Sequence, residues 1–219
     1  MLCRIPLCTL KLFPYQIEHT IQWARDHFEG IFVEDPRETS KYYENPTEYL
    51  EKTVKEFHKV CPILIQKPVA LKQRLESIKR ITDVQQQFTY EACVELARNI
   101  FQEIFFNQIA QLVHNCPLDS KNQNGTPFWS GEKRAPEPIY FKSGDPKHIE
   151  FVQATANIYA HIFGIAQIAD LATVAKIADN VVVPEFKPKK IDIKTEEGGE
   201  PNSEPVKEAE EDEAAIERL

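Results

Sequence analysis

Cys8 is the residue of this chain best placed to carry chemistry. It shares a short segment with Cys3, Arg4 and Lys11, and a stretch with helical periodicity begins a few residues later. Cationic side chains and the N-terminal end of a helix both favour the thiolate over the thiol. Because the thiolate is the nucleophilic form, the pattern makes Cys8 a candidate nucleophile. The residue types alone leave open a second interpretation, in which Cys8 packs at the edge of the domain.

The other three thiols have a simpler interpretation. Cys61 and Cys93 fall on apolar helix faces, where a free cysteine behaves as a small hydrophobic residue, and Cys116 ends the most apolar stretch. The five cysteines are odd in number and widely spaced, which is typical of reduced thiols in a cytosolic or nuclear protein. No cysteines and histidines have the spacing of a zinc module, and no glycine-rich phosphate loop is present. The sequence therefore predicts neither a metal site nor an ATP site.

Helices must position the candidate thiol, because helical periodicity dominates the chain. Residues 14–32 repeat apolar side chains at helical spacing, and Pro14 suits the first position of a helix. Residues 33–45 are polar and predict turns. The run Asn45-Pro46-Thr47-Glu48 combines a cap, a proline and a glutamate in the order that starts a helix. The face of the first helix that we expect to be buried comprises Ile17, Ile21, Ala24, Phe28 and Ile31.

The middle of the chain predicts a central helix. After a break at residues 62–68, a helix leads to a polar turn at residues 85–87. Thr89 is expected to cap the next helix, in which apolar residues cover more than half of the circumference as far as Val113. A helix that is apolar so far round is covered on several sides, so we expect it to form the core.

The last third of the chain begins with a long connection. Residues 116–144 are rich in proline and glycine, and a connection of this length is often functional. Asp145 is expected to cap a further helix, and a shorter helix spans about residues 170–180. Residues 181–186 predict an extended segment, for which a short strand is one interpretation.

The composition predicts a mainly α-helical domain with long loops and little or no β-structure. The chain has 219 residues, of which 42% are hydrophobic, with only 7 glycines beside 15 prolines. Residues 1–190 are the expected domain, and residues 191–219 are an expected flexible, disordered acidic tail. From residue 196 onward ten acidic and two basic residues give a net charge of −8, which equals that of the whole chain. The domain is therefore near neutral, without a basic stripe for nucleic acid or the roughly 18 apolar residues of a membrane helix.

Three blocks of sequence resemble the eukaryotic ubiquitin-activating enzyme family. The first, Leu7-Cys8-Thr9-Leu10-Lys11 with Phe13-Pro14 and the helix pattern from Ile17 to Asp26, is similar to the segment that holds the family's catalytic cysteine. The second consists of Pro127-Phe128-Trp129-Ser130-Gly131, Lys133-Arg134, Pro136 and Pro138, and the third is Val183-Pro184-Glu185-Phe186-Lys187-Pro188. The similarity extends from about residue 5 to residue 190.

The resemblance implies a specific role for the chain. It is similar to the family's second catalytic cysteine half-domain, a mostly helical insertion in the adenylation domain, excised from the whole enzyme. In the family the full enzyme uses ATP and magnesium to adenylate the C-terminal glycine of ubiquitin. The catalytic cysteine, which falls on Cys8, then takes the acyl group as a thioester and passes it to a ubiquitin-conjugating enzyme. The threonine that follows it falls on Thr9, whose hydroxyl could bond the thiolate or the developing oxyanion.

The implied partners are ubiquitin, ubiquitin-conjugating enzymes and the enzyme's own adenylation domains, in the cytoplasm and the nucleus. No cofactor is expected in this chain itself, because ATP and magnesium belong to the adenylation site of the full enzyme. Two alternatives stay open: the same role for another ubiquitin-like modifier, and a helical docking module in which Cys8 is incidental. The connection at residues 116–144 is a candidate cover over the site, unless its Phe128 and Trp129 only pack onto the helices.

Overall fold

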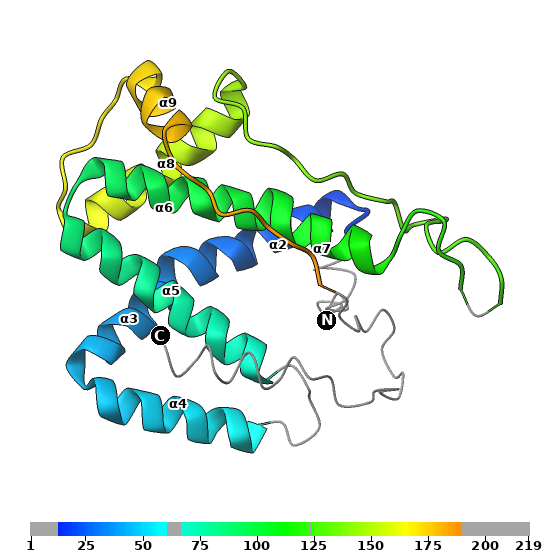
Figure 1. The fold of residues 1–219 in the computed structure, drawn as a ribbon, viewed down its shortest axis with the longest axis horizontal. Helices are drawn as coiled ribbons and strands as arrows, with labels where there is room; N and C mark the ends of the chain where they lie inside the picture. The colour runs from blue at the N-terminus through cyan, green and yellow to red at the C-terminus, as the bar shows by residue number, and fades with distance from the viewer. Residues whose placement is uncertain (1–12, 61–66, 123, 190–219) are drawn as a thin grey trace.

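The computed structural model describes residues 13–60, 67–122 and 124–189 (Figure 1). Its elements are α2 (Ile17–Glu29), the π-helical segment η1 (Gly30–Glu34), α3 (Asp35–Glu44), α4 (Pro46–Val60), α5 (Lys67–Gln87), α6 (Tyr90–Gln102), the π-helical segment η2 (Glu103–Asn107), α7 (Gln108–Asn115), α8 (Pro146–Phe163) and α9 (Leu171–Asp179). Within the three described ranges, β-pairing is limited to one isolated bridge between Lys121 and Pro127. The predicted mainly α-helical class is confirmed.

Three of the predicted helix starts are confirmed by their caps. The backbone N–H of Glu48 donates to the side chain of Asn45 at 3.2 Å, and the Asn45 amide donates back to the Glu48 carboxylate at 3.1 Å. Thr89 accepts a hydrogen bond from the N–H of Ala92, and Asp145 accepts one from the N–H of Lys147. Each of these contacts satisfies an N–H group that has no partner inside its helix.

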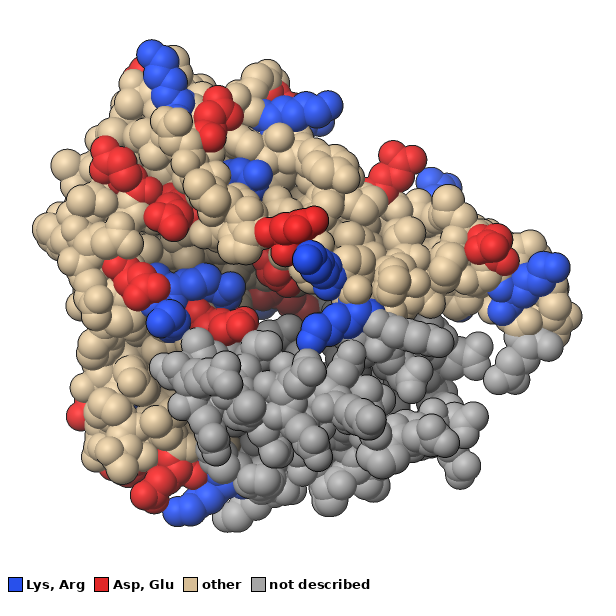
Figure 2. Space-filling model, in the orientation of Figure 1, with Lys and Arg blue, Asp and Glu red and all other residues tan. Residues whose placement is uncertain are grey.

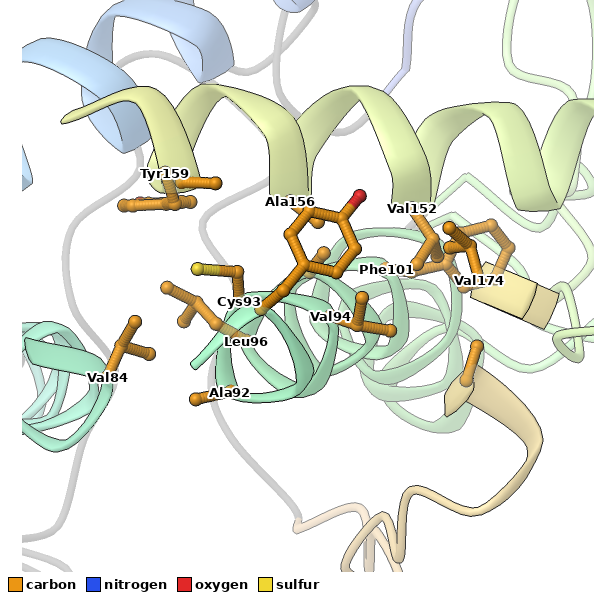
Figure 3. Packing of buried hydrophobic residues seen from close by; sticks show 14 of the residues in the cluster. Val84, Ala92, Cys93, Val94, Leu96, Phe101, Val152, Ala156, Tyr159 and Val174 are labelled. Atoms are coloured by element: carbon orange, nitrogen blue, oxygen red, sulfur yellow. The ribbon is translucent and has the colours of Figure 1, made fainter. Parts of the chain in front are cut away.

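The central helix forms a long rod from α6 through η2 to α7, with α8 and α9 on one side and α5 on the other (Figure 1). Its contact with α8 uses small side chains, and Ala97, Ala156 and Ala160 are fully buried, which lets the two backbones approach closely. Figure 3 shows Val94 and Phe101 of α6 beneath Val152 and Ala156 of α8, with Val174 of α9 beside them. The predicted core helix is confirmed.

The prediction of turns at residues 33–45 is wrong, because the chain stays helical there. The α-helix widens to a π-helix at η1 and continues as α3. Pro36 explains the change. A proline inside an α-helix removes one N–H and its ring collides with the carbonyl four residues earlier, and an extra residue in the turn relieves that collision.

Because Pro36 has no backbone N–H, one carbonyl near the first π-helical segment accepts its hydrogen bond from a distant side chain instead. The backbone N–H of Asp35 donates to the carbonyl of Gly30, five residues earlier. In the same register, the next residue, Pro36, would donate to the carbonyl of Ile31. Pro36 has no N–H, and the Tyr159 hydroxyl donates to the Ile31 carbonyl instead, at 2.8 Å. In the second π-helical segment, the carbonyl of Phe105 accepts a hydrogen bond from the N–H of Ile139 at 2.8 Å. Both π-helical segments are thus held by groups from other parts of the chain.

The buried face predicted for the first helix is also wrong, except at Ile31, which packs against the main core. Ile17, Ile21 and Phe28 of α2 are 67%, 62% and 53% exposed. The helix turns a different face inward, on which His19 is buried and the Trp23 ring lies 6.3 Å from that of Phe105. Aromatic and histidine rings therefore make the contact that the aliphatic stripe was expected to make.

Three smaller expectations also differ from the structure. Helix α2 begins at Ile17 rather than at Pro14, with Gln16 as its cap. Residues 85–87 are the last turn of α5, and the chain turns instead at Phe88, whose φ is +50°. Residues 181–186 form no strand. Cys61 and residues 191–219, for which a core position and a disordered tail were predicted, lie outside the described residues.

Candidate active site

Cys8 and Thr9 lie outside the described residues, so the candidate site is approached from the first residue after them that the structure places. That residue is Phe13, which is only 6% exposed. Phe13 is five positions after Cys8 in the sequence, and a fully extended chain covers at most about 3.6 Å per residue. Covalent connection alone therefore keeps Cys8 within about 18 Å of Phe13.

Phe13 is anchored in an aromatic cluster. Its ring centroid lies 5.7 Å from those of both Phe128 and Trp129, in edge-to-face geometry. Leu112 of α7 and Cys116 complete the buried part of this cluster. Edge-to-face pairs contribute about 0.5–1.5 kcal/mol each beyond their area burial. Phe13, five positions after the predicted nucleophile, is thus fixed to the end of the central rod.

A lysine covers the same cluster. The ammonium nitrogen of Lys133 lies 4.6 Å from the Phe128 ring centroid and 5.3 Å from that of Phe13. A cation at this distance from an aromatic face is attracted by the ring quadrupole. Lys133 therefore adds a positive charge at the point where the cysteine segment joins the body.

The loop that carries these residues folds back on itself. The N–H of Phe128 donates to the carbonyl of Ser120 at 2.8 Å, and the indole N–H of Trp129 donates to the carbonyl of Cys116 at 2.9 Å. Gly125 makes the intervening turn with a φ of +81°, which favours glycine. Phe128 and Trp129 therefore pack onto α7 and Phe13, as the second interpretation expected. Whether the loop also covers Cys8 stays a prediction.

The loop also contacts the residues that lead into α2. Tyr15 donates its backbone N–H to the imidazole of His19 at 3.4 Å, and the two rings meet edge to face. Partial burial and a hydrogen bond with Glu132 raise the pKa of the Tyr15 hydroxyl. Glu132 and Lys133 thus contact residues on both sides of Pro14.

The C-terminal part of the described chain returns to the same end of the rod. The N–H of Lys189 donates to the side chain of Gln111 in α7 at 3.0 Å. In Figure 1 the segment that follows α9 crosses the view of α6 and ends near α7, where Lys189 bonds to Gln111. Phe13 and Phe128, which belong to the first two blocks that carried the resemblance, and Lys189, which directly follows the third, therefore all meet α7.

The two thiols that the structure describes, Cys93 and Cys116, are poor nucleophiles. Burial, together with the nearby charge of Glu91, raises the pKa of the Cys93 thiol to about 11. Burial also raises the pKa of Cys116, although the charge of Lys133 opposes the shift. Both thiols are buried, as predicted, and a raised pKa keeps them protonated near neutral pH.

A cavity of about 120 Å³ lies between the two π-helical segments, away from Phe13. Its polar lining includes Asp35, Ser77, Arg80 and Glu103. Burial raises the pKa of Asp35, while a hydrogen bond with Ser77 and the charge of Arg80 oppose the shift. Because Ser77 and Arg80 from α5 partner Asp35 and Asn107 donates to Glu103, these polar groups serve the packing of the helices around the cavity rather than the candidate site.

Charges elsewhere are mixed in sign. Over the described part of the face in Figure 2, acidic and basic side chains are interspersed and neither forms a continuous patch. Among the described residues, no three histidine, cysteine or acidic side chains are grouped so as to hold a metal ion. No helix in the described ranges is long and apolar enough to cross a membrane.

The fold and the anchored segment define a helical domain that carries a cysteine just before its first described helix. Comparison with protein families agrees with this class. The family model described as "Ubiquitin-activating enzyme, SCCH domain" matches residues 14–219, and the chain belongs to this family. The matched range begins six residues after Cys8 and includes residues 191–219, so the boundary at residue 190 stays a prediction.

Individual relatives support the same family. The "Ubiquitin-like modifier-activating enzyme 1" of Dictyostelium discoideum is 42% identical over 193 residues, which are 88% of this chain and 18% of that protein. The human protein of the same name is 39% identical over 84% of this chain and 16% of its own length. The "Ubiquitin-activating enzyme E1 1" of Arabidopsis thaliana is 32% identical over 84% of this chain. The chain spans less than a fifth of the length of these relatives.

The sequence interpretation missed the contacts that anchor the cysteine segment. Phe13, Phe128, Trp129 and Lys133 were noticed only as parts of separate blocks, and nothing in their spacing shows that they meet. The signal that could have linked them is the recurrence of aromatic residues next to proline outside any helix, since such residues need a common place to be buried.

Proposed function

We propose that this chain is the thioester-forming domain of a ubiquitin-activating enzyme, with Cys8 as its nucleophile. The observation that carries the proposal is family membership over residues 14–219, combined with the Leu7-Cys8-Thr9-Leu10-Lys11 segment directly before the anchored Phe13. The names of the relatives state activation of ubiquitin or of ubiquitin-like modifiers. The partners would be ubiquitin, ubiquitin-conjugating enzymes and the adenylation domains of the parent enzyme, in the cytoplasm and the nucleus.

In the proposed reaction the Cys8 thiolate attacks the carbonyl carbon of the ubiquitin adenylate. A carbon–sulfur bond forms, the carbon–oxygen bond to phosphate breaks, and AMP leaves with the electron pair of that bond. The proton of the thiol goes to solvent. The Thr9 hydroxyl is proposed to donate a hydrogen bond to the developing oxyanion. The thiol of a conjugating enzyme then attacks the thioester, and Cys8 leaves as thiolate.

This chemistry fits a site without a dedicated base. An acyl-adenylate is already activated, and a few per cent of an ordinary thiol is ionised at neutral pH. A modestly perturbed pKa also suits a thiol that must both attack and later leave, because a lower pKa makes a thiol leave faster but also makes it a weaker nucleophile. Adenylation itself would use ATP and magnesium in the remainder of the parent enzyme, since the sequence of this chain contains no glycine-rich phosphate loop.

The test is Cys8→Ala in the full-length enzyme, supplied with ubiquitin and ATP. We expect ATP–pyrophosphate exchange to continue, because adenylation does not need the thiol. The conjugate with ubiquitin that a reducing agent cleaves should disappear. Cys93→Ala provides a matched control that should keep the conjugate, because Cys93 is buried in the core. A reducible conjugate that persists in the Cys8→Ala enzyme would refute the assignment.

A further inference from the structure

Asn124 and Gly125 form the tip of a small hairpin in the loop between α7 and α8. The bridge between Lys121 and Pro127 closes this hairpin, and both residues of the tip are exposed. Asn124 is the only asparagine of the sequence that precedes a glycine. Because glycine has no side chain, its backbone nitrogen is open to approach by the side chain before it.

Thr126 directs two hydrogen bonds at the side-chain carbonyl of Asn124. Its backbone N–H donates to Oδ1 of Asn124 at 3.2 Å, and its hydroxyl donates to the same oxygen at 2.7 Å. The Thr126 hydroxyl also accepts a hydrogen bond from the amide of Asn122 at 3.1 Å, which leaves its proton for Asn124. Two donors on one carbonyl oxygen stabilise the negative charge that develops there when a nucleophile attacks the carbonyl carbon.

We propose that Asn124 and Gly125 are an autocatalytic modification site, at which Thr126 assists the closure of a succinimide ring. The backbone nitrogen of Gly125 loses its proton to a base from solvent and attacks the side-chain carbonyl carbon of Asn124. A carbon–nitrogen bond forms, the bond from that carbon to the amide nitrogen breaks, and ammonia leaves with the electron pair and a proton from water. Water then opens the ring and leaves aspartate or isoaspartate at position 124.

The attacking nitrogen is held in the turn but is within reach of solvent. The N–H of Gly125 donates to the carbonyl of Asn122 at 2.9 Å, and this hydrogen bond must open before the nitrogen attacks. Because Gly125 is exposed, water can replace the lost contact and a base can reach the proton. The two donors of Thr126 do not take part in that contact, so they stay in place for the attack.

The isoaspartate product changes the loop that anchors Phe13. In isoaspartate the backbone runs through the side chain, which lengthens the tip of the hairpin by one carbon. The N–H of Asn122 donates to the carbonyl of Thr126, and the N–H of Phe128 donates to the carbonyl of Ser120, both at 2.8 Å. Loop length fixes the register of a hairpin, so a longer tip disturbs this pairing. We therefore expect the product to loosen Phe128, whose ring meets that of Phe13.

The test follows the tip peptide by mass spectrometry while the purified chain is kept for days in mildly alkaline buffer, folded or in concentrated urea. Conversion replaces an amide by a carboxylate, which changes the peptide mass. In the folded chain, Thr126→Val should slow conversion about tenfold, the effect of one net hydrogen bond. In urea, where the turn is lost, this variant and the wild type should convert at similar rates. Thr126 is exposed, so the fold tolerates the substitution.

Ser130→Ala is the matched control, because it removes a hydroxyl of the same loop that bonds to Pro127 and not to Asn124. It should convert at the wild-type rate in both conditions. Equal rates for the folded wild type and Thr126→Val, or an equal slowing in urea, would overturn the role of Thr126. A folded wild-type chain that keeps its amide would overturn the site itself.

Amide hydrogen exchange at Phe128 tests the effect on the loop. Chains with isoaspartate at the tip should exchange this N–H several-fold faster than Asn124→Asp chains, which carry the same charge without the extra backbone carbon. Equal exchange would contradict the loosening of the loop. None of these measurements involves Cys8, so their failure and failure of the Cys8→Ala test can be told apart.

Discussion

The hydrogen bond from Tyr159 to Ile31 offers the most direct test of how the fold holds the first π-helical segment. Tyr159 is 1% exposed, and its hydroxyl donates to the Ile31 carbonyl at 2.8 Å. Burial, which is the main cause, raises the pKa of this hydroxyl, so it stays protonated and remains a donor. The substitution Tyr159→Phe removes the donor and keeps the ring that packs against Phe32.

The expected loss of stability follows from the Ile31 carbonyl, which loses its hydrogen-bond donor. Ile31 lies on a partly buried turn, and the Pro36 that would follow in the π-helical register has no N–H to offer. Leaving a buried acceptor without a partner costs about 1–3 kcal/mol. We therefore expect Tyr159→Phe to lower the free energy of unfolding by about 2 kcal/mol.

The assay is urea unfolding followed by circular dichroism, with Tyr140→Phe as the control. Tyr140 is 69% exposed, so its substitution should change the free energy of unfolding by no more than about 0.5 kcal/mol. A double-mutant cycle with Pro36→Ala sharpens the test, because alanine restores a backbone N–H near Ile31. The loss caused by Tyr159→Phe should be smaller in the Pro36→Ala background, by about 1 kcal/mol. Equal losses in both backgrounds would refute the role assigned to Pro36.

Three further predictions concern the cluster at α7, the α3–α5 contact and the core thiol. Phe13→Ala should lower the free energy of unfolding by about 3 kcal/mol. In a Trp23→Phe background it should also shift the fluorescence of Trp129, which contacts Phe13. An unchanged fluorescence spectrum would contradict the anchoring of Phe13 in the aromatic cluster. Burial favours the neutral form of Glu38, but hydrogen bonds from Lys41 and Tyr49 and the charge of Arg74 outweigh it and lower the pKa of Glu38 below its ordinary 4.5. The stability that Glu38 contributes is therefore present above pH 4.5 and lost as the pH falls through its lowered pKa. As the pH is lowered, the free energy of unfolding should fall less steeply for Glu38→Gln than for the exposed control Glu44→Gln. With a pKa of about 11, only about one Cys93 thiol in ten thousand is ionised at neutral pH, so iodoacetamide should modify Cys93 in concentrated urea and not in the native protein, as peptide mass spectrometry would show.

Local patterns determined where most helices begin. The caps at Asn45, Thr89 and Asp145 were predicted and are confirmed, because a cap bonds to an N–H only two or three residues away. The apolar circumference of the central helix predicted its place in the core for a similar reason, since periodicity is a property of neighbouring turns. The resemblance that pointed to Cys8 also needed only a short run of residues.

Contacts between residues far apart in the sequence decided which helix faces are buried and which segments meet. The stripe of Ile17 and Ile21 predicted a buried face, yet the body covers His19 and Trp23, because the surroundings of a helix choose which face is buried. Residues 33–45 looked like turns, yet they are helical, and Tyr159, far along the chain, donates to the Ile31 carbonyl in place of Pro36. The meeting of Phe13 with Phe128 likewise follows from tertiary packing alone. The sequence by itself thus named the thiol and its family, and only the tertiary structure decided what holds the chain beside it.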